Sequence, residues 1–253
     1  MRIRGRDVQV FSVSFLDVIS CALGGTLLLL LAMEERSQQI VQEAQHKQQQ
    51  AETERDAAQE NVQRLAQLQK ALTGLGGNLK HVVYVIDVSG SMAESEDSNA
   101  IPEHYLNQFC LKITELPSED FNVVSFNHEA HVWQPNRMLE HSDRNVERAC
   151  AHVRTLRAEN MTNTYKALQA AYGLPGVDTI ILFTDGDPSV NAAGIPLADD
   201  DPAASDRYKQ ELVDFVAAQG DSIILNTVAI GEKVDSSFLS NLAAIGGGAN
   251  TSL

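Results

Sequence analysis

The chain has few basic residues for its length. Its 253 residues include 19 Lys and Arg against 34 Asp and Glu, a net charge of −15 with histidine neutral. Most of this excess lies in residues 80–253, where 25 acidic residues oppose 11 basic ones, a net charge of −14. Because such a surface repels phosphate groups, it argues against nucleic acid and anionic lipid as partners of this region.

Recognisable catalytic motifs are also absent. The sequence contains no Gly-x-Ser-x-Gly nucleophile elbow and no Gly-rich phosphate-binding loop. The run His128-Glu129-Ala130-His131 lacks the His-Glu-x-x-His spacing of zinc proteases and falls in a predicted hairpin. We therefore expect that the protein is not an enzyme.

Cysteine is scarce, with three in the whole chain. Cys21 lies in an apolar N-terminal run, whereas Cys110 and Cys150 lie in the acidic region. In an oxidising compartment the last two could form a disulfide. Nothing in the sequence places them close together, so their pairing stays open.

An apolar run followed by alternating polar residues is the most informative feature present. Residues 82–86 read Val-Val-Tyr-Val-Ile, which predicts a short strand buried on both faces. Asp87, Ser89 and Ser91 follow at alternate positions, with Gly90 between the serines. In a tight loop their side-chain oxygens can converge on one point, and oxygen ligands suit a small hard cation such as Mg²⁺.

Two more oxygen-bearing residues are expected at the same edge of the sheet. Thr162 precedes a predicted helix over residues 165–172, and Asp185 follows a predicted buried strand over residues 179–184. In open α/β sheets, sites form outside the carboxyl ends of the strands. Taken singly, Ser89 and Ser91 could be loop residues, and Thr162 and Asp185 could be helix N-caps.

Together these residues resemble the von Willebrand factor A (VWA) domain with its metal-ion-dependent adhesion site. That site consists of Asp-x-Ser-x-Ser, then a Thr, then an Asp in a Thr-Asp-Gly turn, and all of these occur here in order. The resemblance implies a doubly wound α/β fold over residues 79–253, with a mostly parallel sheet. It also implies a Mg²⁺ site, with Mn²⁺ or Ca²⁺ as alternatives, formed by Asp87, Ser89, Ser91, Thr162 and Asp185. A protein ligand offering an Asp or Glu would complete the metal shell.

The remaining pattern of residues 80–253 predicts alternating strands and helices. Further strands are expected at 120–126, 130–133 and 222–230, the first two forming a hairpin. Further helices are expected at 144–157, 207–219 and 236–245, the last ended by Gly246-Gly247-Gly248.

The N-terminal part has a long apolar run of its own. Residues 8–33 contain five consecutive leucines and would measure about 38 Å as a helix, enough to span a bilayer with tilt. Three arginines precede this run and two glutamates follow it. The positive-inside rule therefore predicts a cytoplasmic N-terminus, with residues 79–253 periplasmic or extracellular. A cleaved signal peptide is the alternative, although no clear cleavage site follows the run.

Asp17 lies inside this predicted span, among small residues that would permit close helix packing. An ionisable group at that depth is costly and indicates a function. The run Phe15-Leu16-Asp17-Val18 behind a short basic tail resembles the ExbD, TolR and MotB stator subunits. That resemblance implies that Asp17 carries protons in a channel shared with a multi-span MotA/ExbB-like partner.

Residues 34–78 are rich in Gln, Glu and Ala, which predicts a helical stalk. An apolar residue recurs every seven positions, so a coiled coil and a homodimer are expected, mainly over residues 58–72. A single solvated helix or a flexible stalk is the alternative. The three glycines in residues 73–78 predict a hinge before the first strand.

Two functions from different classes follow from these features. The first is a stator-like subunit of the inner membrane that conducts protons and transmits force, with a Mg²⁺-dependent protein-binding site outside the membrane. The second is a passive, membrane-tethered adhesion or assembly module in which Asp17 only pairs helices. Substitution of Asp17 would distinguish the two.

Overall fold

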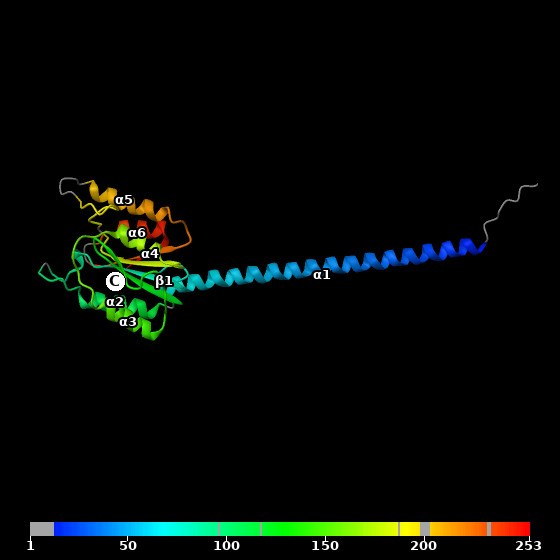
Figure 1. Ribbon diagram of the computed structural model, residues 1–253, viewed down its shortest axis with the longest axis horizontal. Helices are drawn as coiled ribbons and strands as arrows, with labels where there is room; N and C mark the ends of the chain where they lie inside the picture. The colour runs from blue at the N-terminus through cyan, green and yellow to red at the C-terminus, as the bar shows by residue number, and fades with distance from the viewer. Residues whose placement is uncertain (1–12, 96, 117, 187, 198–202, 232–233) are drawn as a thin grey trace, which may run out of the picture. The chain divides into compact units, whose positions relative to one another are not determined.

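The computed structural model describes residues 13–253 apart from 96, 117, 187, 198–202 and 232–233. The chain divides into two compact units, residues 1–63 and 64–253. The first unit consists, in its described part, of one helix, α1, which runs without a break from Val13 to Thr73 and so extends into the second unit (Figure 1). The helical stalk predicted for residues 34–78 is therefore helical up to Thr73.

No helix in the described ranges is both long enough and apolar enough to cross a membrane. The transmembrane helix predicted for residues 8–33 is thus not found among them, and residues 8–12 lie outside the described part. The side chain of Asp17 is not described either, so its predicted role stays a prediction.

One sheet organises the second unit. Its strand order is β3-β2-β1-β5-β6-β7, with the short β4 pairing with β2. All pairs are parallel except β2–β3 and β2–β4, so the predicted mostly parallel α/β sheet is confirmed, as is the predicted hairpin of β2 and β3. The strands are β1 (His81–Asp87), β2 (Asp120–Phe126), β3 (Ala130–Val132), β4 (Leu139–Glu140), β5 (Thr179–Thr184), β6 (Ile224–Ala229) and β7 (Gly247–Ser252).

Helices cover both faces of this sheet, as Figure 1 shows. Helices α2 (Glu103–Glu115) and α3 (Asp143–Val153) pack on one face, whereas α4 (Thr164–Tyr172), α5 (Ala204–Ala217) and α6 (Ser236–Ile245) pack on the other. Alternate residues of each central strand enter opposite layers, because successive strand side chains point to opposite faces. In β1, for example, Tyr84 and Ile86 join the α2–α3 layer while Val83 and Val85 join the α4–α6 layer.

Three elements were not predicted from the sequence: α2, the two-residue β4 and β7. Regular structure continues beyond α6 into the glycines 246–248, because residues 247–252 form β7 and pair in parallel with β6. Gly248 passes so close to β6 that a Cβ there would lie 2.1 Å from the carbonyl oxygen of Leu225. The glycines therefore permit the strand pairing that their low strand propensity disfavours.

The predicted hinge at residues 73–78 is instead an anchored segment. Gly74, with φ +70°, ends α1, and the chain then enters the domain through buried Leu75 and Gly76. The buried side chain of Asn226 in β6 accepts a hydrogen bond from the Gly76 N–H (2.7 Å) and donates one to the Gly76 carbonyl (3.0 Å). Its Oδ1 also accepts one from the Ala249 N–H of β7 (3.0 Å). The glycines of this segment therefore allow the backbone to approach β6 closely, and they do not form a freely rotating hinge.

Candidate metal site

Asp87, the last residue of β1, is fully buried and held in place by its neighbours. Its Oδ1 accepts a hydrogen bond from the Ser89 N–H (2.8 Å), and its Oδ2 accepts one from the Thr184 hydroxyl at the end of β5 (2.7 Å). Strand β1 lies between β2 and β5, so the run of buried apolar residues that precedes Asp87 places its carboxylate at the centre of the sheet edge.

The two serines follow at a short 3₁₀ turn, η1 (Gly90–Met92), with Ser89 as its N-cap and Ser91 inside it. The hydroxyl oxygens of Ser89 and Ser91 lie 3.1 Å apart. Met92 is buried in the α2–α3 layer and so fixes the turn against the core. The structure therefore brings Asp87, Ser89 and Ser91 together, as the alternating pattern predicts.

Thr162 lies on a neighbouring loop that is bonded to the same turn. The Gly90 N–H donates to the Asn160 carbonyl (2.9 Å), and the Glu159 N–H donates to the Val88 carbonyl (2.9 Å). Thr162 is buried, and its N–H donates to the hydroxyl of Ser189 (2.7 Å). Thr162 is not the N-cap of α4, because Asn163 accepts the capping hydrogen bond from the Lys166 N–H (3.0 Å).

Asp185 follows β5 and is partly buried at the same edge. Gly186 after it has φ +96°, a conformation that favours glycine, and its N–H donates to the Thr184 hydroxyl (3.1 Å). Asp185 does not cap a helix, since α5 begins only at Ala204 with Ala203 as its N-cap. The N-cap alternatives for both Thr162 and Asp185 are therefore wrong.

The surroundings of Asp87 disfavour the charged form of its carboxylate. Burial and then the neighbouring charge of Asp185 raise the pKa of Asp87 to about 7, although hydrogen bonds from Ser89 and Thr184 act to lower it. A buried carboxylate close to a second one is stabilised by a bound cation. The donor set of two carboxylates and three hydroxyls consists only of oxygen, so these residues fit Mg²⁺ or another hard divalent ion.

Acidic residues alone do not define this site. Among the residues that the structure describes, no three His, Cys, Asp or Glu side chains gather into a group that could hold a metal. The set predicted from the sequence has two acids and three hydroxyl residues, and its metal binding stays a prediction.

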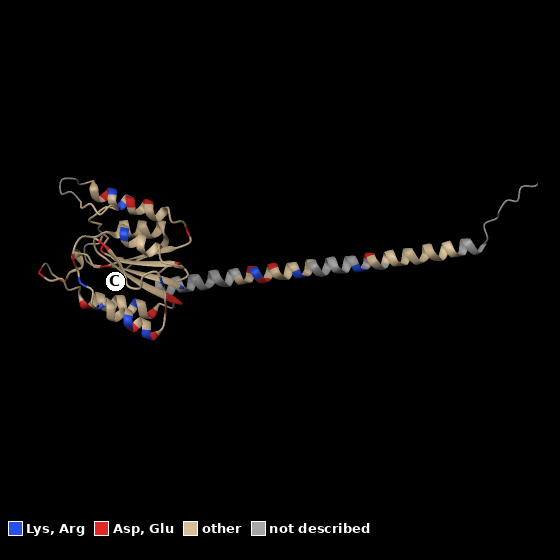
Figure 2. Cartoon of the chain, viewed as in Figure 1, with Lys and Arg blue, Asp and Glu red and all other residues tan. Residues whose placement is uncertain are grey.

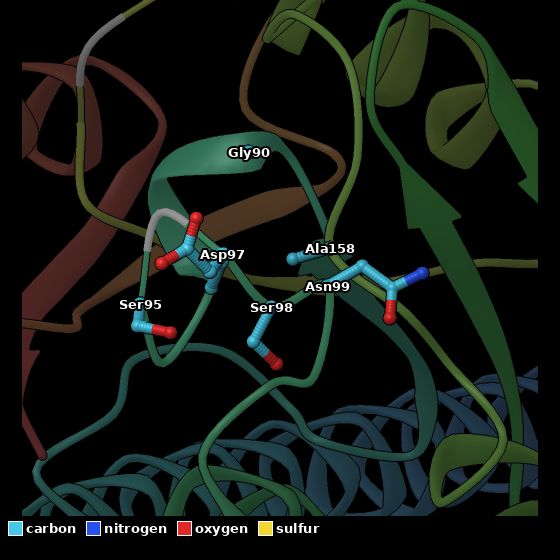
Figure 3. Close-up of a pocket in the computed structure, with 7 residues that line it drawn as sticks. Gly90, Ser95, Asp97, Ser98, Asn99 and Ala158 are labelled. Atoms are coloured by element: carbon cyan, nitrogen blue, oxygen red, sulfur yellow. The ribbon is translucent and has the colours of Figure 1, made fainter.

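Two cavities flank the loop that follows η1. One, of about 600 Å³, lies beside the site and is lined by Ser91 and Asp185 together with His104 and Tyr105 of α2. The other, of about 570 Å³, is lined by Gly90 and by polar residues of the same loop, among them Ser95, Asp97 and Ser98 (Figure 3). His104 and Tyr105 are not among the residues predicted beside this site from the sequence, because no helix is predicted there at α2.

The fold and this edge define a class of protein: a doubly wound α/β domain with an oxygen-lined site at the carboxyl ends of β1 and β5. The family model for the von Willebrand factor type A domain matches residues 80–251. The chain therefore belongs to the VWA domain family. The match begins at residue 80, so it gives no support to the resemblance of the N-terminal segment to stator subunits.

Curated relatives match part of the chain. Inter-alpha-trypsin inhibitor heavy chain H4 from Homo sapiens is 32% identical over 131 residues, which is 46% of this chain and 13% of that protein. Heavy chain H2 from Sus scrofa is 28% identical over 177 residues, 65% of this chain and 17% of that protein. The chain thus spans less than a fifth of the length of these relatives.

Solved structures show the same fold. Protein BatB from Bacteroides thetaiotaomicron has a TM-score of 0.50 and 14% identity, covering 69% of this chain and 90% of that one. The PilB minor pilin from Streptococcus sanguinis has a TM-score of 0.51 and 15% identity, covering 69% of this chain and 57% of that one. At these identities the likeness concerns the fold alone.

Proposed function

We propose that this protein is a binding module that recognises a protein ligand through a divalent cation. The cation, Mg²⁺ with Mn²⁺ or Ca²⁺ as alternatives, would be held by Asp87, Ser89, Ser91, Thr162 and Asp185. The observation that carries this proposal is the buried carboxylate of Asp87, which is fixed by two hydrogen bonds and lies close to a second carboxylate. An Asp or Glu of the ligand would supply a further oxygen to the cation.

The hydrogen bonds of Asp87 and the neighbouring cavity would each contribute to such binding. Thr184 and the Ser89 N–H orient the Asp87 carboxylate, so little ordering is required when the ligand arrives. The cavity beside Ser91 and Asp185 offers room for the side chain next to the ligand's acidic residue. Since the donors at this edge are those of a cation site, we infer a role in adhesion or assembly rather than catalysis.

Calorimetric titration with Mg²⁺ and Mn²⁺ tests the proposal. The purified full-length chain should bind one divalent ion, and Asp185→Ala should abolish that binding. Asp221→Ala is the matched control, because it removes the same charge from an exposed position before β6. Equal binding in the wild type and Asp185→Ala would remove the site assignment.

We propose as a second candidate that residues 8–33 anchor this module in the inner membrane, with the N-terminus cytoplasmic; the absence of a spanning helix concerns the described residues, which exclude residues 8–12. The supporting observation is a group of large apolar side chains on α1 that are 40–70% exposed, in a stretch without charge (Figure 2). Such a surface needs lipid or protein to cover it. The group consists of Val18, Ile19, Leu23, Leu27, Leu28, Leu29, Leu30, Leu31 and Met33.

In this second candidate the protein is a stator-like homodimer whose Asp17 carries protons beside a multi-span MotA/ExbB-like partner. Asp17→Asn keeps the size of the side chain and a hydrogen-bonding amide but removes the titration. Proton flux should therefore be lost in Asp17→Asn and partly kept in Asp17→Glu, while Mg²⁺ binding stays unchanged in both. Full activity in Asp17→Asn would leave only the tethered binding module.

A further inference from the structure

Two cysteines meet where α2 packs against α3. Cys110 on α2 and Cys150 on α3 are both buried, with exposed fractions of 6% and 7%. The Cys110 sulfur lies 3.8 Å from the Cys150 carbonyl oxygen, and the Cys150 sulfur lies 3.9 Å from the Cys110 carbonyl oxygen. Each sulfur therefore reaches across the interface to the other residue rather than along its own helix.

We propose that Cys110 and Cys150 form a reversible disulfide that cross-links α2 to α3. The reciprocal contacts show that the helices are already close enough for each thiol to touch the opposite cysteine, so the bond requires little movement of the backbone. The proposal concerns a modification site and does not depend on the metal site.

The electrostatic surroundings favour one thiol as the nucleophile. A hydrogen bond from the Cys110 thiol, aided by the positive charge of Arg154, lowers the pKa of Cys150 to about 7 even though burial opposes this. The same pairing raises the pKa of Cys110. Because the thiolate is the reactive form, Cys150 attacks first.

The oxidant in this proposal is a low-molecular-weight disulfide. The Cys150 thiolate attacks one of its sulfurs, the external S–S bond breaks, and one small thiolate leaves. Cys110 then gives up its proton and its sulfur attacks the Cys150 sulfur of the mixed disulfide, which releases the second small thiolate. Two protein thiols are oxidised to one disulfide, and one external disulfide is reduced to two thiols that take up the protons.

Burial sets the rate of this reaction. The oxidant reaches the sulfurs only when the α2–α3 contact opens locally, so oxidation should take minutes to hours rather than seconds. The bond would close a loop of residues 110–150 that contains β2, β3 and β4. It would also fix α2, whose His104 and Tyr105 line the cavity beside the metal site.

The test uses the full-length chain carrying Cys21→Ser, which leaves only the two cysteines of interest. Native protein is incubated with oxidised glutathione, then examined by intact mass and by thiol titration after denaturation. We expect a mass loss of two hydrogen atoms, a fall from two free thiols to none, and a melting temperature raised by roughly 5–10 °C and restored by dithiothreitol.

Single variants provide the controls. In the Cys21→Ser background, Cys110→Ser and Cys150→Ser should each keep the same melting temperature with and without oxidised glutathione. Neither should lose the mass of two hydrogen atoms. A stable glutathione adduct in the two-cysteine protein, or two thiols still free after prolonged oxidation, would overturn the proposal. A disulfide that forms between two chains instead of within one would overturn it equally.

Discussion

Acidic residues have opposite kinds of neighbour at the two ends of the central strands, here called the amino edge and the carboxyl edge of the sheet. At the amino ends of β1 and β2, acidic residues pair with bases: Lys80 with Glu119 and His81 with Asp120, each at 2.8 Å. At the carboxyl ends, Asp87 instead lies close to another carboxylate, Asp185, and the acidic charge of that neighbour contributes to raising its pKa.

Under the proposed function, this difference separates structural acids from metal-binding ones in a chain where acids are abundant. An acid that is neutralised by a neighbouring base contributes to the fold, modestly where the pair is exposed. Two acids brought together in a buried place are unfavourable for folding. In the proposed function, a bound cation offsets this cost. Changes at the amino edge should therefore alter stability without altering metal binding, and changes at the carboxyl edge should do the reverse.

The largest effect is expected from Asp87→Asn. The amide keeps the size of the carboxylate, and its oxygen can still accept the hydrogen bond from the Ser89 N–H, but the charge is removed. Mg²⁺ affinity should therefore fall at least about 100-fold, or about 2.7 kcal/mol. Thermal melting checks this: Mg²⁺ should raise the melting temperature of the wild type but not that of the variant. In EDTA the variant should be no less stable than the wild type.

Asp120→Asn supplies the control at the opposite edge, because it makes the same chemical change to an acid that has a basic partner. Its Mg²⁺-induced rise in melting temperature should equal that of the wild type. If Asp120→Asn loses the response as Asp87→Asn does, the division between the two edges is wrong.

The next largest effect is expected from Asn226→Ala. The change leaves the Gly76 N–H, the Gly76 carbonyl and the Ala249 N–H without their side-chain partner. The free energy of unfolding should fall by about 2–4 kcal/mol in urea titrations, while Mg²⁺ binding is kept. Asn145→Ala, at a partly exposed asparagine that also bonds a carbonyl, should cost far less.

Asp235→Ala tests an acid near the carboxyl ends of the strands that pairs with a base. Its carboxylate caps α6 at the Phe238 N–H (3.1 Å) and pairs with Lys209 of α5 (2.7 Å). The hydrogen bond from Lys209, followed by those from Ser237 and the Phe238 N–H, lowers the pKa of Asp235. The stabilisation is therefore present above the usual aspartate pKa and is lost as the pH falls through the lowered value.

We therefore expect Asp235→Ala to lower the free energy of unfolding by about 1–2 kcal/mol at neutral pH. In acid the difference from the wild type should shrink. Asp214→Ala, at an exposed acid on α5, is the comparison and should have little effect at either pH. If Asp235→Ala lowers the free energy of unfolding equally at both pH values, the assigned role of the charge is contradicted.

The smallest effect is expected from His81→Gln. The hydrogen bond to Asp120 raises the pKa of His81, so the stabilisation is fully present below the usual histidine pKa and is lost as the pH rises through the raised value. The variant should be a few tenths of a kcal/mol less stable near pH 6 and equal to the wild type near pH 8.5. Urea unfolding at both pH values measures the difference in the free energy of unfolding between the variant and the wild type. A difference that grows with pH would contradict the prediction.

Much of the fold was predictable because its strongest signals are local. Apolar runs bounded by polar residues predicted β2, β5 and α6 with the observed bounds. The spacing of Asp87, Ser89 and Ser91 predicted a convergent loop because a single turn of chain connects them. Helix α2 was also predictable, since Leu106, Phe109, Cys110 and Ile113 repeat with helical spacing and are all buried.

Other features depend on partners that are distant in the sequence. Nothing near Gly247 indicates a strand, because β7 exists only through its pairing with β6. The contact between Cys110 and Cys150 joins residues 40 positions apart, and that between Gly76 and Asn226 joins residues 150 apart. Such contacts follow from the assembled topology, which local patterns do not specify.

The anchoring of residues 74–79 has a mechanical consequence. Tension applied to the chain before Gly74 would be transmitted through the hydrogen bonds of Gly76 to Asn226, and so into β6 and, through Ala249, into the final strand β7. In the sheet, β5 separates β6 from β1, the strand that ends at Asp87. The hydrogen bonds to Asn226 therefore come before β1 along the chain, so β6 and β7 would bear part of a pull before it reached the strand that ends at Asp87.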